Sequence, residues 1–122
     1  MKKILIVDDD QNLREIYTDI LTKEGYSIDQ AKDGEEGYYA LSRGGYDLIL
    51  LDLILPKMDG LMILQKLRSE APLKPNGPII ILSNIGQSTL NEKVLTLGAK
   101  ESITKSDYTP DQIVAKVKNY LK

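Results

Sequence analysis

The chain has 122 residues, of which 42% are hydrophobic and 28% are charged, and its formal net charge is -2. This composition is typical of one globular domain and excludes the disordered and fibrous classes of protein. Because the sequence has no basic stripe, no signal peptide and no apolar run near the roughly 20 residues of a membrane span, we expect a cytoplasmic protein that does not bind nucleic acid or membrane directly.

Strand-like and helix-like segments alternate along the chain. Most of the strand-like segments are continuous runs of Ile, Leu and Val, as in strands buried on both faces, and the helix-like segments carry apolar residues at helical spacing. In chain order we expect a strand at 4–7, a helix at 11–24, a strand at 26–31, a helix at 34–42, a strand at 46–51, a helix at 60–71, a loop at 72–78, a strand at 79–82, a helix at 90–97, a strand at 102–104 and a helix from 110 to the end.

Two of these helices have clear termini in the sequence. Asp10 is a suitable N-cap for the first helix, and Gly25 marks its end. The last helix follows Thr109, with Pro at its first position and Gln three residues after the cap. Apolar residues follow at helical spacing in the first helix, at Leu13, Ile16, Tyr17, Ile20 and Leu21. In the last helix we expect a buried stripe of Ile113, Val114, Val117, Tyr120 and Leu121.

The alternation predicts an α/β fold, a doubly wound five-stranded parallel sheet with helices on both faces. The commonest five-stranded solution has the flavodoxin-like strand order 2-1-3-4-5, whose switch point lies between the first and third strands. No repeat, linker or low-complexity segment divides the chain, so we expect residues 1–122 to form one domain with no output domain.

Charged or polar residues stand where four of the expected strands end. Asp8 and Asp9 follow the first strand, and Asp52, Ser83 and Lys105 stand at the ends of the third, fourth and fifth. Ligands of parallel sheets bind beyond the carboxyl ends of the strands. We therefore expect three carboxylates and one ammonium group to converge at one edge of the sheet.

Three carboxylates held close together repel one another unless a cation lies among them. Mg²⁺ suits such a site because it prefers oxygen ligands and is typically held by one or two carboxylates plus a phosphate. With no Cys and no His in the chain, covalent chemistry is left to a carboxylate, a hydroxyl or an amine. The pattern indicates phosphoryl transfer, with Asp52 as nucleophile, Lys105 as charge partner and Ser83 as hydrogen-bond donor. The structural alternative is that Lys105 simply pairs with Asp8 or Asp9 in a closed salt-bridge cluster.

The chain resembles response-regulator receiver domains, and the resemblance covers nearly the whole sequence. It is carried by segments 4–10 (ILIVDDD), 51–60 (LDLILPKMDG), 81–83 (ILS) and 98–99 (GA) and by Lys105. The resemblance implies that Asp52 accepts a phosphoryl group from the phosphohistidine of a sensor kinase or phosphotransfer protein. It also implies that Mg²⁺ is bound by the side chains of Asp9 and Asp52, by Asp8 through a bound water and by the carbonyl of Ile54. The phosphoryl oxygens would be contacted by Ser83, Lys105 and the backbone N–H of Asn84.

Three positions depart from the pattern of that family. Ser106 follows Lys105 where the family usually has Pro after a cis bond, and because a cis bond before a non-proline residue costs about 3–4 kcal/mol, we expect a trans bond. Ser102 stands where many receivers have Tyr or Phe, so we expect a switch that uses no aromatic rotamer, unless Tyr108 takes that place. Asn84 replaces the usual Ala or Gly, and either narrows access to the phosphoacceptor or serves only as a turn former.

Ile54 and Ile85 lie two residues beyond Asp52 and Ser83, where side chains of the family flank the phosphoryl group. Two apolar groups cannot orient a water molecule as an amide or carboxylate would, so we predict slow autodephosphorylation. Ordinary loop packing is the competing interpretation of each isoleucine.

We expect a stand-alone phosphoacceptor switch rather than an enzyme with a separate substrate. Phosphorylation adds about -1.5 to -2 charge, which should draw Ser83 and Lys105 toward Asp52. The face formed by strands four and five and the last helix should then change and bind a downstream protein. Two other functions remain open. One is a phosphorylation-independent interaction module on a receiver scaffold, supported by Ser102 and Ser106, and the other is the receiver part of a longer DNA-binding regulator.

Overall fold

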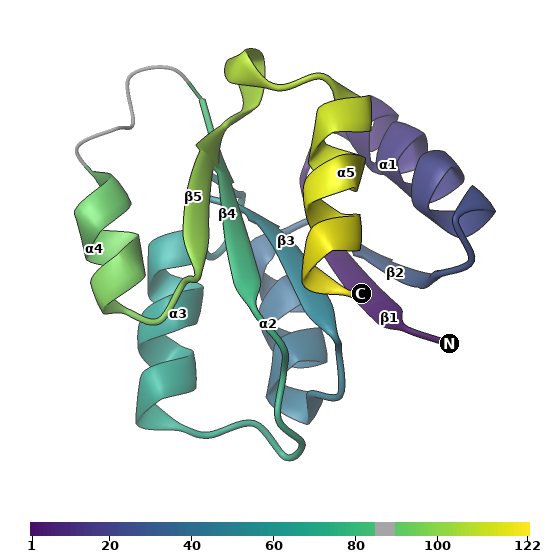
Figure 1. The fold of residues 1–122 in the computed structure, drawn as a ribbon. Coiled ribbons are helices and arrows are strands. Elements are labelled where there is room, and N and C mark those ends of the chain that lie inside the picture. Colours follow the sequence, from purple (N-terminus) through teal and green to yellow (C-terminus); the bar gives the residue numbers. More distant parts are fainter. Residues whose placement is uncertain (85–89) are drawn as a thin grey trace.

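The chain folds around one parallel sheet with the strand order β2-β1-β3-β4-β5 (Figure 1). A computed structural model describes residues 1–84 and 90–122. The order confirms the predicted flavodoxin-like topology, with its switch point between β1 and β3. The strands are β1 (Lys3–Val7), β2 (Ser27–Ala31), β3 (Leu48–Asp52), β4 (Ile79–Ser83) and β5 (Glu101–Thr104).

Helices cover both faces of the sheet, as predicted (Figure 1). The side chains of α1 and α5 pack on one face, and those of α2, α3 and α4 pack on the other. The helices of the described residues are α1 (Gln11–Lys23), α2 (Gly34–Arg43), α3 (Gly60–Ser69), α4 (Asn91–Thr96) and α5 (Pro110–Tyr120), and the short 3-10 helix η2 (Lys105–Asp107) follows β5.

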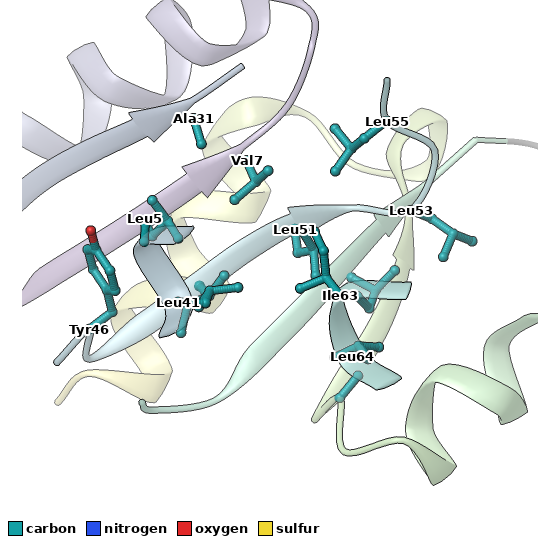
Figure 2. Packing of buried hydrophobic residues seen from close by; sticks show 14 of the residues in the cluster. Leu5, Val7, Ala31, Leu41, Tyr46, Leu51, Leu53, Leu55, Ile63 and Leu64 are labelled. Atoms are coloured by element: carbon teal, nitrogen blue, oxygen red, sulfur yellow. The ribbon is translucent and has the colours of Figure 1, made fainter. Parts of the chain in front are cut away.

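Alternate residues of the central strands form two separate hydrophobic clusters. Leu5 of β1 belongs to the cluster with Leu41 of α2 and Ile63 of α3, which Figure 2 shows, whereas Ile4 belongs to the cluster with α1 and α5. This alternation follows from the two-residue period of a strand. Burial of each large side chain contributes about 1.5–3 kcal/mol, so a continuous apolar run is what a strand covered on both faces requires.

Two features of the helices could not be taken from the apolar spacing alone. Ile16 shares the helical spacing of the apolar residues of α1, but 41% of its surface is exposed. At about 100° per residue, it lies at the flank of the face that Tyr17 and Leu21 bury in the core. Helix α3 ends at Ser69 rather than at residue 71, because Pro72 disfavours helical backbone in the residue before it.

The predicted helix caps are present. Asp10 accepts hydrogen bonds from the first turn of α1, and Thr109 and Gln112 form a capping box at the start of α5. None of the described helices is both long enough and apolar enough to cross a bilayer.

Candidate functional site

Three carboxylates gather at the edge of the sheet where the strands end. Asp8 and Asp9 directly follow β1, and Asp52 is the last residue of β3. One oxygen from each side chain lies within 4.8 Å of those from the other two. Asp8 and Asp52 are buried, with 0% and 3% of their surface exposed, whereas Asp9 is exposed to solvent. Because β1 and β3 are hydrogen-bonded neighbours, the switch point brings residues distant in sequence to one site.

Lys105 reaches this site from the end of β5. Its Nζ lies 3.0 Å from Asp8 Oδ2 and 3.0 Å from Asp52 Oδ2, and only 15% of its side chain is exposed. The pair with Asp8 that the structural alternative predicted is present, and the same ammonium group also contacts Asp52, so Lys105 bridges the two buried carboxylates. The Lys105–Ser106 peptide bond is trans, as predicted, and the lysine reaches the site without the usual proline.

Burial and charge shift the pKa of Asp52 in opposite directions. Burial raises the pKa of its carboxyl and Lys105 lowers it, while Asp8 and Asp9 raise it, and the resulting pKa is about 6. Burial lowers the pKa of the Lys105 ammonium group, but Asp52 and Asp8 outweigh burial and raise this pKa overall. The site therefore contains the ammonium group of Lys105, which stays charged, and three carboxylates. One of these, Asp52, takes up a proton in weakly acidic solution.

The two oxygens of Asp52 have different surroundings. Oδ2 accepts a hydrogen bond from Lys105 at 3.0 Å, whereas the buried Oδ1 has no hydrogen-bond partner among the described residues. A buried acceptor without a partner costs about 1–3 kcal/mol. Such an oxygen is suited to bind a cation or to attack an electrophile.

The three consecutive acids after β1 have different contacts. Asp8 Oδ1 accepts a hydrogen bond from the backbone N–H of Asp10 at 2.9 Å. Asp10 in turn accepts from the backbone N–H groups of Asn12 and Leu13 and so caps α1. Asp9 has no hydrogen bond or ion pair with any other described residue. Of the three carboxylates, that of Asp9 is thus the most accessible to a ligand arriving from solvent.

Arg14 of α1 also contacts this segment. Its Nη1 donates to the carbonyl oxygen of Asp8 at 2.7 Å, and its Nε donates to Gln30 Oε1 of β2 at 3.2 Å. The sequence carries no signal for this contact, because the arginine acts through a backbone carbonyl, which every residue type offers.

Two serine side chains form hydrogen bonds that involve β5. Ser83 ends β4, and its hydroxyl donates to the carbonyl oxygen of Ile103 at 3.3 Å. Ser102 donates to Asn91 Oδ1 at 2.9 Å and so joins β5 to α4. Ser102, which stands where many receivers have an aromatic residue, thus forms a hydrogen bond with α4.

The segments that follow β3 and β4 complete the surroundings of Asp52. Ile54 is 50% exposed, and Asn84 is exposed directly after β4, whereas Ile85 lies outside the described residues. Gly60 begins α3 close against β3, since a Cβ at this position would lie 2.9 Å from the carbonyl oxygen of Asp52. This glycine lets the helix start directly beside the end of the strand.

Comparison with known proteins identifies the family. The family model for the response regulator receiver domain matches residues 4–118. The chain belongs to this family. The transcriptional regulatory protein DltR of Streptococcus agalactiae is 38% identical to this chain over 116 residues, which are 95% of this chain and 50% of DltR. The transcriptional regulatory protein SrrA of Staphylococcus aureus is 36% identical over 120 residues, which are 98% of this chain and 48% of SrrA, so the chain spans about half the length of these relatives.

Solved receiver structures share the fold. A two-component response regulator from Clostridium difficile superposes with a TM-score of 0.85 at 30% identity, covering 99% of this chain and 96% of its own. TrrA from Thermotoga maritima, solved in complex with Mg(2+)-BeF, has a TM-score of 0.78 at 36% identity and covers 98% of this chain and 99% of its own. Receiver domains are regulatory switches of two-component systems rather than enzymes with separate substrates, and response regulators work with a sensor kinase.

Proposed function

We propose that this receiver domain is a phosphoacceptor in which Asp52 takes a phosphoryl group from the phosphohistidine of a sensor histidine kinase or phosphotransfer protein. The observation that supports this most directly is the buried Oδ1 of Asp52, which has no partner among the described residues although Lys105 lies 3.0 Å from Oδ2. A bond forms between an Asp52 oxygen and phosphorus while the bond from phosphorus to the imidazole nitrogen breaks. The freed imidazole of the donor takes up a proton from solvent.

The carboxylate cluster fits Mg²⁺. Asp8, Asp9 and Asp52 offer only oxygen atoms, and Lys105 alone does not neutralise them. We assign the ligands as the side chains of Asp9 and Asp52, Asp8 through a bound water, and the carbonyl of Ile54. TrrA was solved in complex with Mg(2+)-BeF, which supports the same ion for this chain. When bound, Mg²⁺ would neutralise developing charge on the phosphoryl oxygens.

Lys105 and the end of β4 would hold the transferred group. Lys105 already contacts Asp52, so it can pass from a carboxylate oxygen to a phosphoryl oxygen with little movement. Ser83 would exchange its hydrogen bond with Ile103 for one to the phosphoryl group. The backbone N–H of Asn84 would donate to another phosphoryl oxygen, and such charge-assisted hydrogen bonds are about twice as strong as neutral ones.

This exchange would carry the signal to the face formed by β4, β5 and α5. Phosphorylation adds about -1.5 to -2 charge, which attracts Lys105 and the Ser83 hydroxyl. Movement of β5 would reach α5 through Glu101, because Tyr120 of α5 donates to it at 2.5 Å and Lys116 of α5 forms an ion pair with it. We propose that a downstream protein binds this face in one of its two arrangements.

Incubation with acetyl phosphate and Mg²⁺, followed by measurement of the intact mass, tests the phosphoacceptor. We expect the wild-type chain to gain one phosphoryl group and Asp52→Asn to gain none, because a carboxamide is a poor nucleophile. Asp59→Asn is the matched control, since Asp59 caps α3 and asparagine caps helices equally well. A wild-type chain that stays unmodified would support the phosphorylation-independent interaction module instead.

Replacing Ile54 with Asn should shorten the lifetime of phospho-Asp52. An exposed isoleucine two residues after the acceptor cannot orient an attacking water, whereas an amide can. We expect the rate of dephosphorylation to increase several-fold, which is less than the roughly 100-fold that a positioned general base supplies. Loss of the phosphoryl group from purified phosphoprotein in Mg²⁺ measures the rate, and Leu73→Asn, at a position that is 85% exposed and outside the site, should leave it unchanged. A wild-type half-life of only seconds would contradict the slow autodephosphorylation predicted from Ile54 and Ile85.

We further propose that residues 1–122 act as one receiver domain in the cytoplasm and that this domain binds protein partners rather than nucleic acid. The lack of a basic stripe supports protein partners. Since DltR and SrrA are transcriptional regulatory proteins of which the chain covers 50% and 48%, the alternative is the receiver part of a longer DNA-binding regulator. The length of the open reading frame distinguishes the two.

A further inference from the structure

The carbonyl group of Asp8 is held by Arg14, a side chain to which the phosphoacceptor chemistry assigns no role. We propose that Arg14 is a positioning residue for the metal site. By binding the Asp8 carbonyl, it fixes the peptide group from which Asp9 extends and so holds the Asp9 carboxylate in place for Mg²⁺. This inference rests on the proposed Mg²⁺-dependent function.

The peptide bond makes this connection direct. The carbonyl of Asp8 and the nitrogen and Cα of Asp9 lie in one plane, so a hydrogen bond that fixes the carbonyl also fixes the direction in which Asp9 leaves β1. The carbonyl accepts from Arg14 Nη1 at 2.7 Å. Asp9 itself has no hydrogen bond or ion pair with another described residue, so its carboxylate depends on the backbone for its position.

Arg14 is itself held from two sides. It lies in the first turns of α1, a helix anchored in the core by Tyr17 and Leu21. Its Nε donates to Gln30 of β2 at 3.2 Å while Nη1 binds the Asp8 carbonyl. The planar guanidinium group makes both bonds at once, which a flexible ammonium group does less well. The end of β1 is thus linked to both α1 and β2.

The charge of Arg14 acts on Mg²⁺ in the opposite direction. A positive group beside a cation site repels the incoming ion, so loss of its charge alone would tighten Mg²⁺ binding. Loss of the hydrogen bond to the Asp8 carbonyl would weaken binding, because Asp9 would adopt several orientations. The sign of the change therefore separates a positioning role from a general electrostatic one.

Calorimetric titration of the full chain with Mg²⁺ tests the inference. We expect Arg14→Met to weaken Mg²⁺ binding by about 10-fold, the lower end of what loss of a residue supporting a metal ligand usually costs. Lys32→Met is the matched control. Lys32 directly follows β2 at the same edge of the sheet and pairs with Glu36, so its loss removes a positive charge without touching Asp8 or Asp9. Mg²⁺ binding by this variant should be unchanged or slightly tighter.

Each outcome bears on a different claim. Mg²⁺ binding by Arg14→Met that equals or exceeds wild-type binding would overturn the positioning role and leave the proposed function intact. A wild-type chain that binds no Mg²⁺ would overturn the proposed function and this inference with it. If Arg14→Met does not fold, Gln30→Ala decides the question, because it keeps the arginine charge and removes only one support. Weaker binding by Gln30→Ala supports the inference, and unchanged binding overturns it.

Discussion

Replacing Lys105 with Met should lower the free energy of unfolding by about 2–4 kcal/mol at neutral pH without Mg²⁺. Lys105 lies 3.0 Å from both Asp8 and Asp52, so its loss leaves two buried carboxylates facing each other. The folded variant limits this penalty by taking up a proton. Because protonation of a carboxyl of ordinary pKa at pH 7 costs about 4 kcal/mol, the loss of stability should not exceed that value.

The destabilisation should depend on pH in a defined direction. The pKa of Asp52 is already raised to about 6 in the wild-type chain, and loss of Lys105 raises it further. Between the unfolded pKa and this higher folded pKa, the folded variant binds a proton that the unfolded chain releases, so its stability increases as the pH falls. Since the wild-type chain itself binds this proton below about pH 6, the difference between the variant and the wild-type chain should shrink as the pH falls from about 8 to about 6.

Urea unfolding at several pH values measures this effect. Lys118→Met is the control, because Lys118 pairs with Glu24 while 51% of its side chain is exposed. Loss of such an exposed pair should cost less than about 1 kcal/mol, with little dependence on pH. A Lys105→Met variant as stable as the wild-type chain at pH 8 would show that the two buried carboxylates do not depend on this lysine.

Replacing Asp9 with Asn should abolish the stabilisation of the chain by Mg²⁺ while leaving the metal-free fold intact. Saturation of a site at 100 times its Kd adds about 2.7 kcal/mol to the stability of the folded state. Asp9 is exposed and has no hydrogen bond or ion pair with another described residue, so its loss should change metal-free stability by less than about 0.5 kcal/mol. Thermal unfolding with and without Mg²⁺ measures both quantities.

The same measurement has an internal control and a dependence on pH. Asp19→Asn makes the same change of charge at an exposed position of α1 and should keep the full response to Mg²⁺. In the wild-type chain, the response should fall as the pH drops through about 6, because protonation of Asp52 removes a ligand. A full response to Mg²⁺ in Asp9→Asn would exclude Asp9 from the metal ligands.

Much of the fold could be predicted because local patterns and tertiary structure agree. The run Ile4–Val7 is apolar at every position, and the structure buries alternate residues under helices on opposite faces. The caps at Asp10 and Thr109 depend only on neighbouring residues, so they could be recognised directly. The exposure of Ile16 could not, because helical spacing alone does not say how wide a face the rest of the protein covers.

The sequence by itself determined which chemical groups stand at the strand ends, since Asp8, Asp9, Asp52, Ser83 and Lys105 could be located there from strand boundaries alone. Only the tertiary structure decided how these groups interact. It buries Asp8 and Asp52 around one lysine, leaves Asp9 in solvent and brings Arg14 to a backbone carbonyl. These outcomes depend on distances between side chains from different strands and on the water excluded around them. A linear pattern contains neither quantity.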